Sequence, residues 1–345
     1  MFGKRYSLEK KVAKPVDVPW RNPVRNPIRK CPGFEKKELA IYKLDAMAFC
    51  QFGCVYCSSN CGNLMRINTA AIKRWTKKIV GVPLNSRTDA EKFFMSYPGI
   101  VESLEEQLLS YPKLTKVEGV LQFGMLVDNF SPFLVGNGIT LQILMLLLEK
   151  TKFIIRILSK SAAVARNEFI ELFQRYPGRV TVGSSCGTLN ADEIRHVELF
   201  TSSPSARAKA IRSLQETGIR TFLMACPILP GFADKNEIEE LYSAFNPPRL
   251  ESAWCEPYND RANWKSLLDA YKNYEKRAEL FKIMSDKREW ASYALSLAQT
   301  HADTLKKQGF KGNSIFLLYQ DGMTAREIEI AKKIPSVSFQ SGALK

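Results

Sequence analysis

The chain has 345 residues, and 45% of them are hydrophobic, a fraction typical of a globular protein with a core. No apolar run reaches the roughly 18 residues of a membrane helix, and the basic, Pro-rich start lacks the apolar part of a secretory signal. We therefore expect a cytoplasmic protein without membrane contact. The net charge is +15, with eleven Lys or Arg against four Asp or Glu in residues 1–38 and five basic residues but no acidic one in 66–78. This clustering fits a nucleic-acid partner, although solubility or a general basic bias would also explain it.

The N-terminal part of the chain is expected to be an extended arm leading to a strand and a basic helix. Five prolines discourage helix in residues 1–37. The first predicted strand, 38–45, ends just before a cysteine-rich loop. A helix is expected over 68–79, with Asn68 and Thr69 as candidate N-caps, and another over 101–110.

From residue 116 onwards, predicted strands alternate with predicted helices. The strands are 116–123, 153–158, 179–184, 220–226 and 250–256, and the helices are 140–150, 163–175, 205–217 and 235–245. With 38–45 this makes six strands, and such alternation implies right-handed βαβ units and a parallel sheet. We expect one barrel-like α/β domain over 38–258, preceded by the arm 1–37. Residues 259–345 should form a mainly helical extension with a short strand at 314–318.

Four of the eight cysteines lie within twelve residues, from Cys50 to Cys61. In a reducing compartment a cluster of this kind indicates metal binding or catalysis rather than disulfides. Cys50, Cys54 and Cys57 have the spacing C-x3-C-x2-C. Three thiolates on one short loop can hold three irons of a 4Fe–4S iron–sulfur cluster and leave the fourth iron open for a small molecule. The loop follows a predicted strand, and parallel barrels carry their chemistry at the carboxyl ends of strands.

Three other interpretations of the cysteines compete with this one. A zinc knuckle usually needs two ligand pairs separated by about 12–20 residues, and these four cysteines lie too close together. A four-cysteine electron-transfer cluster would use Cys61 as its fourth ligand, and the spacing does not forbid it. The cysteines could also be plain buried thiols, but four within twelve residues argue against that.

The cysteine motif after the first strand resembles that of the radical S-adenosylmethionine superfamily, in which the aromatic residue at the position of Tyr56 is typical. Further resemblance, to the spore photoproduct lyase-like branch of that superfamily, extends over about residues 38–245. It lies at the strand ends, in Gly124 to Pro132, Ile157 to Ser161, Val182 to Ser185, Glu198 to Arg207 and Cys226 to Gly231. The resemblance implies a partial (βα)6 TIM-like barrel.

The resemblance also implies the cofactors and the residues that hold them. Cys50, Cys54 and Cys57 would bind the 4Fe–4S cluster, and S-adenosylmethionine would chelate the open iron. Tyr56 would pack against the adenine, or simply fill the core beside the loop. The residues expected to hold the ribose and carboxylate of the cofactor are Asp128, Lys160, Ser184 and Ser185. Glu198 and Arg207 also lie in the matching segments, but they could pair with each other, which would give them a structural role. An electron donor such as flavodoxin or ferredoxin would reduce the cluster.

Two residues depart from the pattern of the branch. Spore photoproduct lyase returns a hydrogen atom from a cysteine at the position of Met125, and a thioether cannot do so; Cys61 is not part of the family motif. Cys186, Cys226 and Cys255 lie near other strand ends and could replace the missing thiol, although a buried structural role is more common. The catalytic residues thus stay undetermined.

Three functions fit these features. The first is a radical enzyme that acts on nucleic acid, and the second is a radical enzyme that acts on a peptide or metabolite. The third is an iron–sulfur electron carrier or sensor without turnover, which would have no need for the cofactor residues Asp128 and Lys160.

Overall fold

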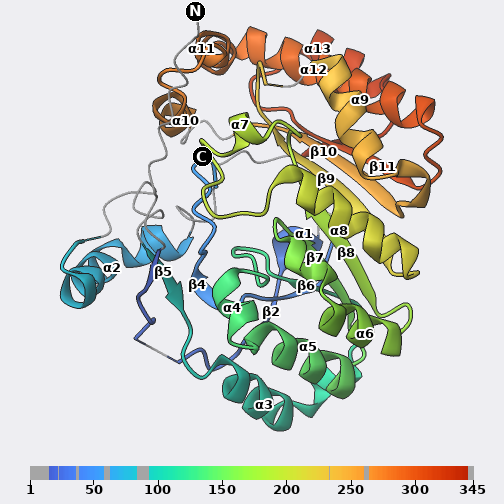
Figure 1. The fold of residues 1–345 in the computed structure, drawn as a ribbon. Helices are drawn as coiled ribbons and strands as arrows, with labels where there is room; N and C mark the ends of the chain where they lie inside the picture. Colours follow the sequence, from blue (N-terminus) through green and yellow to red (C-terminus); the bar gives the residue numbers. More distant parts are fainter. Residues whose placement is uncertain are drawn as a thin grey trace, which may run out of the picture.

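The computed structural model describes residues 15–21, 23–35, 39–57, 63–83, 93–232, 234–259 and 264–340, with side chains in the second helix described from Ala70 onwards (Figure 1). Within these residues, no helix is long and apolar enough to cross a membrane.

The main body is a nine-stranded sheet with the order β12-β11-β10-β9-β8-β7-β6-β3-β2. Neighbouring strands are parallel except for β2 and β3, which are antiparallel. Among the described residues no pairing joins β12 to β2, so the sheet is open, as a partial barrel requires. The strands are β2 Ile28–Lys30, β3 Tyr42–Leu44, β6 Val120–Phe123, β7 Ile154–Ser159, β8 Val180–Ser185, β9 Arg220–Ile228, β10 Ser252–Pro257, β11 Asn313–Tyr319 and β12 Val337–Gln340.

Helices connect these strands and cover the outer face of the sheet (Figure 1). Along β7 and β10, fully buried residues alternate with half-buried ones, because one face packs against helices and the other is less covered. The helices are α1 Pro32–Glu35, α3 Ile100–Ser110, α4 Pro132–Gly136, α5 Ile139–Lys150, α6 Asn167–Arg175, α7 Ala191–Ile194, α8 Pro204–Glu216, α9 Lys235–Ala244, α10 Trp264–Ala270, α11 Arg277–Ser285, α12 Lys287–Lys307 and α13 Ala325–Lys332.

The predicted α/β partial barrel with an N-terminal arm and a mainly helical extension is confirmed. The six predicted strands correspond to β3 and to β6 through β10, with ends that shift by a few residues. The arm was expected to be extended, but its described part is not extended throughout. It contributes β2 to the main sheet and forms the one-turn helix α1, which Pro32 can begin because the first helical position needs no backbone N–H.

A second, smaller sheet is built from strands that lie before and after the cysteine loop in the sequence. This sheet was not predicted from the sequence. It has the order β1-β5-β4, with β1 Val16–Asp17, β4 Met47–Phe49 and β5 Phe93–Ser96. The loop therefore leaves β4 rather than the strand at 38–45, which ends at Leu44. Helix α2, Asn63–Val80, packs on this sheet and starts five residues earlier than expected, so Asn68 and Thr69 lie within it. The two share a core formed by Val18, Phe49, Ile72, Phe93 and Met95.

The C-terminal extension continues the main sheet. The predicted strand at 314–318 is β11, which pairs in parallel with β10, and β12 was not expected. Helix α12 packs on both α9 and β11. Its buried His301 bonds Tyr242 Oη at 2.6 Å through Nδ1 and Ser314 Oγ at 3.0 Å through Nε2.

Candidate active site

The three motif cysteines lie on a tight loop that is mostly inaccessible to solvent. Cys50 and Cys54 are each 8% exposed, and Cys57 is half-buried. Gly53 has a φ of 61°, a left-handed conformation that glycine adopts without strain, and the Cys57 amide closes a turn on the Cys54 carbonyl at 3.1 Å. Gly53 thus lets the loop bend tightly between its first two cysteines.

Burial dominates the electrostatics of the buried loop thiols. Burial, the Asp128 carboxylate and Cys57 together raise the pKa of Cys50 to about 12, against backbone hydrogen bonds from Phe52 and Asp128. Burial also raises the pKa of Cys54 well above its usual value, with smaller contributions from Cys57 and Cys50. A thiolate is therefore costly in this loop unless a cation compensates its charge.

Backbone and side-chain contacts attach the loop to the segment that follows α7. Cys54 forms an isolated antiparallel bridge with Glu198, and the Val55 amide donates to the Val197 carbonyl at 2.8 Å. The Glu198 side chain is 1% exposed. Its Oε1 accepts the Tyr56 hydroxyl, and its Oε2 accepts the Arg207 guanidinium. The predicted pairing of Glu198 with Arg207 is confirmed, and it includes Tyr56.

Lys160 lies at the centre of the predicted cofactor residues. Its ammonium donates to Ser185 Oγ, lies 3.9 Å from Glu198 Oε1 and stands 5.6 Å from the centre of the Tyr56 ring. Burial lowers the pKa of Lys160, but Glu198 and Cys54 outweigh this effect, so the pKa is raised and the side chain stays charged. The structure thus brings Tyr56, Lys160 and Ser185 together beside Cys54.

Asp128 lies next to these residues, but its oxygens already accept hydrogen bonds. Ser159 Oγ lies 2.9 Å from both carboxylate oxygens, the Lys160 amide donates to Oδ2 at 2.7 Å, and the Phe130 amide donates to Oδ1 at 2.9 Å. These bonds connect the end of β6 to the end of β7. They position the Lys160 backbone, and the expected contact of Asp128 with a ribose stays a prediction.

The two serines at the end of β8 differ. Ser185 Oγ donates to the Cys226 carbonyl at 2.8 Å and accepts Lys160, so the serine links β7, β8 and β9. Ser184 is 4% exposed, and its hydroxyl has no hydrogen-bond partner among the described residues. A buried hydroxyl without a partner costs free energy.

The donor set of the loop fits an iron–sulfur cluster. Three thiols lie on eight residues, and iron would compensate the thiolate charge that burial disfavours at Cys50 and Cys54. Among the described residues, no three Cys, His, Asp or Glu side chains converge closely enough to hold one metal ion. A 4Fe–4S cluster does not require three side chains to converge on one point, because each thiolate binds a different iron.

The remaining cysteines lie in different environments. Cys186 and Cys255 are fully buried, and Cys226, at the end of β9, is half-buried. Cys31 is 4% exposed and donates to Met125 Sδ at 3.1 Å. Cys61, the possible fourth ligand, lies outside the described residues.

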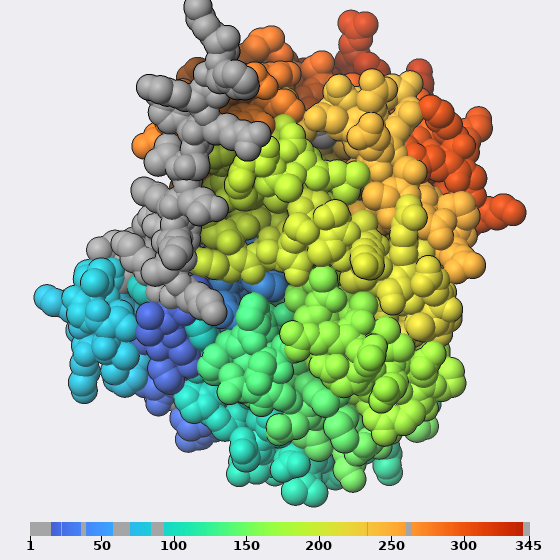
Figure 2. Space-filling view, viewed as in Figure 1, coloured from blue at the N-terminus to red at the C-terminus, as the bar shows by residue number. Residues whose placement is uncertain are grey.

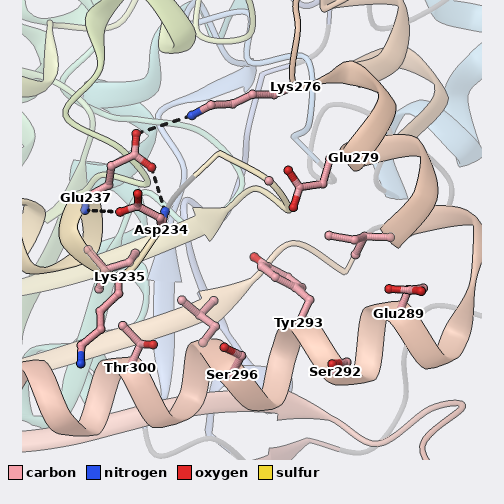
Figure 3. Close-up of a pocket in the computed structure, with 14 residues that line it drawn as sticks. Asp234, Lys235, Glu237, Lys276, Glu279, Glu289, Ser292, Tyr293, Ser296 and Thr300 are labelled. Carbon is pink, nitrogen blue, oxygen red and sulfur yellow. Dashed lines mark hydrogen bonds and ion pairs between the residues drawn. The ribbon is translucent and has the colours of Figure 1, made fainter.

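A cavity of about 540 Å³ lies apart from this site. It lies between α9, α11 and α12, and hydroxyls of α12 line one wall (Figure 3). Lys276 pairs with Glu237 at 3.5 Å across it. None of the predicted cofactor residues lines this cavity.

Comparison with known structures supports the fold. A variant of spore photoproduct lyase with bound S-adenosylmethionine and dinucleoside spore photoproduct has a TM-score of 0.50 to this chain, at 16% identity over 87% of this chain and 80% of that one. Spore photoproduct lyase complexed with dinucleoside spore photoproduct has a TM-score of 0.45 at 14% identity, and the match spans 68% of this chain and 62% of that one. Streptococcus suis SuiB bound to its precursor peptide SuiA has a TM-score of 0.40 at 13% identity, over 82% of this chain and 60% of that one.

No protein-family model matches the sequence, and no curated protein sequence does either. The match to the variant of spore photoproduct lyase shows the fold alone, an open and mostly parallel α/β sheet. In particular, the chain is structurally similar to spore photoproduct lyase, as the sequence resemblance predicted.

One group of polar residues at the strand ends escaped the sequence reasoning. Cys226 Sγ donates to Glu256 Oε2 at 3.3 Å, and the Tyr319 hydroxyl and Asn259 also bond Glu256. Glu256 lies near the end of β10, and Cys226 lies near the end of the neighbouring parallel strand β9. The signal was therefore available once the parallel strand order was assumed.

Proposed function

We propose that this protein is a radical S-adenosylmethionine enzyme that holds a 4Fe–4S cluster on Cys50, Cys54 and Cys57. The observation that carries the proposal is the position of the Lys160 ammonium beside Cys54, Tyr56 and Ser185, at the carboxyl ends of β7 and β8. An electron carrier has no need for a charged lysine and a hydroxyl beside its cluster, whereas a cofactor with a carboxylate needs such groups.

The residues of the chain would bind and orient the cofactor. Lys160 would neutralise its carboxylate, and the Ser184 hydroxyl, which has no partner among the described residues, would donate to one of its polar groups. Ser185 would hold the Lys160 ammonium in position. Glu198 would keep the Tyr56 ring in place through the hydroxyl that it accepts. When bound, cluster and S-adenosylmethionine together supply a 5′-deoxyadenosyl radical, which removes a hydrogen atom from a substrate.

The test is anaerobic turnover. The full chain is reconstituted with iron and sulfide, reduced and supplied with S-adenosylmethionine, and 5′-deoxyadenosine is measured by mass spectrometry. We expect product from the wild type and from Cys186→Ala, and none from Cys50→Ala. Absence of product, together with an electron-resonance signal that S-adenosylmethionine does not change, would support a cluster-bearing carrier instead.

We further propose that the substrate is a nucleic acid. The support is the basic face of α2, on which Arg74, Lys77 and Lys78 are exposed while Ile72 packs against the small sheet. Helix α2 projects at the edge of the molecule (Figure 2). Within the described part of the chain, no carboxylate forms an ion pair with these three residues. Lys77 and Lys78 lie in the last turn of α2, where positive side chains stabilise the helix dipole. This is a purely structural explanation for part of the charge.

A further inference from the structure

We propose that Cys226 is the hydrogen-atom donor of this site, with its thiol held in place by Glu256. The inference rests on the proposed function, because a donor is needed only where a substrate radical forms. It assigns a residue that neither the cysteine motif nor the predicted cofactor set includes.

Cys226 faces the same end of the sheet as the cluster loop. The charge of Lys160 acts on both the Cys54 thiol and the Cys226 thiol, so the ammonium lies within electrostatic reach of each. The Cys226 carbonyl also accepts Ser185 Oγ, the same hydroxyl that accepts Lys160. A molecule bound against Lys160 and Ser185 would therefore lie next to the strand position that carries the Cys226 thiol.

The Glu256 carboxylate holds the thiol, and two further side chains hold the carboxylate. Cys226 Sγ donates to Glu256 Oε2 at 3.3 Å, and Asn259 Nδ2 donates to Glu256 Oε1 at 3.5 Å. The Tyr319 side chain bonds the same carboxylate from β11. Burial and the Glu256 carboxylate raise the pKa of Cys226 well above its usual value, so the sulfur keeps its proton, and hydrogen-atom donation requires an S–H bond.

The other cysteines outside the motif that the structure describes are less suited. Cys255 is fully buried and lies against Tyr242, and Cys186 is fully buried and bonds the Thr188 carbonyl at 3.2 Å. Cys31 is 4% exposed, and its thiol points at Met125. Of these four thiols, Cys226 is the one that is both half-buried and at a strand end beside Lys160.

Hydrogen-atom donation by Cys226 breaks one bond and forms one. The S–H bond of Cys226 breaks homolytically, and the hydrogen atom forms a C–H bond at the substrate carbon radical. A thiyl radical stays on Sγ. One electron, from the same low-potential reductant that reduces the cluster, and one proton from solvent restore the thiol.

The first test needs neither cofactor nor substrate. The apo chain is treated with iodoacetamide, and labelling of each cysteine is followed by mass spectrometry. We expect Cys226 to react about tenfold faster than Cys186 or Cys255, and faster still in Glu256→Gln, which removes the charge that disfavours the thiolate. A Cys226 that is as protected as Cys186 overturns the proposal.

The second test uses S-adenosylmethionine alone, so that the 5′-deoxyadenosyl radical takes the place of the substrate radical, breaks the S–D bond of the donor and forms a C–D bond. The reconstituted enzyme is reduced with titanium citrate in heavy water, in which S–H exchanges to S–D, and deuterium in 5′-deoxyadenosine is measured. We expect Cys226→Ala to lower the deuterated fraction to less than about a third of that in the wild type, with Cys186→Ala unchanged. An unchanged fraction in Cys226→Ala, or a loss in Cys31→Ala instead, overturns the assignment. Failure of the wild type to form 5′-deoxyadenosine refutes the proposed function, and the labelling test still decides the position of Cys226.

Discussion

At the scale of single residues, the carboxylate of Glu198 connects most of the predicted site. It accepts Tyr56 from the cysteine loop and Arg207 from α8, and it attracts Lys160 from the end of β7. Burial raises the pKa of Glu198, but Arg207 and Lys160 outweigh burial and lower it, so the group is ionised at neutral pH. Because the folded-state pKa is lowered, this stabilisation is present above the unfolded-state pKa and is lost as the pH falls through the folded value.

We predict that Glu198→Gln destabilises the fold strongly. The substitution leaves the Arg207 guanidinium, which is 1% exposed, without its counter-charge. Breaking a buried ion pair typically costs about 3–5 kcal/mol. The free energy of unfolding in urea measures the effect. The control is Asp192→Asn, which removes the exposed partner of Arg195 and should cost less than about 1 kcal/mol. Equal costs for the two variants would contradict a buried network.

At the scale of elements, α12 attaches the C-terminal extension to the barrel through His301. Its ring bonds Tyr242 of α9 on one side and Ser314 of β11 on the other, and the side chain is fully buried. Burial lowers the pKa of His301 to about 3. The unfolded chain therefore binds a proton near pH 6.5 that the folded chain binds only near pH 3.

We predict that acid weakens the protein through this histidine. Between these two pH values the unfolded state holds the extra proton, so stability falls by about 1.4 kcal/mol for each unit of pH lost. Unfolding in urea at about pH 6.5 and about pH 5.5 should show about 1 kcal/mol more loss for the wild type than for His301→Asn. If both proteins lose the same amount, His301 is not neutral and buried as described.

Sequence reasoning found the elements whose pattern is periodic. Strands such as β7, with strict alternation of burial, were predicted within a few residues, whereas β5 is buried on all four residues and gives no period-2 signal. The residues Lys160 and Ser185 were predicted from the family resemblance of the segments Ile157 to Ser161 and Val182 to Ser185. The contact of Glu198 with Tyr56 could not be predicted, because it joins residues 142 positions apart and depends on how the loop meets the segment after α7. The contact of Cys226 with Glu256 was missed, although the parallel order of β9 and β10 already places the two residues near each other.

At the scale of the whole molecule, the positive charge of the chain should determine how it meets a polyanion. Binding of DNA and RNA oligonucleotides is measured against salt by fluorescence anisotropy. We predict that Lys77→Gln with Lys78→Gln reduces the salt slope by about 0.9 for each phosphate that the protein no longer neutralises. The matched control, Lys306→Gln with Lys307→Gln, changes the last turn of α12 and should leave the slope unchanged. Binding without salt dependence would contradict the nucleic-acid proposal and favour a peptide or a metabolite as substrate.

The proposed chemistry depends above all on a cluster held by three cysteines of one loop. Iron analysis and electron-resonance spectra of the anaerobically reconstituted chain decide whether that cluster forms. The wild type should bind about four irons, and Cys50→Ala, Cys54→Ala and Cys57→Ala should each lose most of the cluster. Cys61→Ala and Cys186→Ala should keep it. A wild type with a single metal ion, or a full cluster in any of the three loop variants, would refute the assignment of these cysteines as cluster ligands.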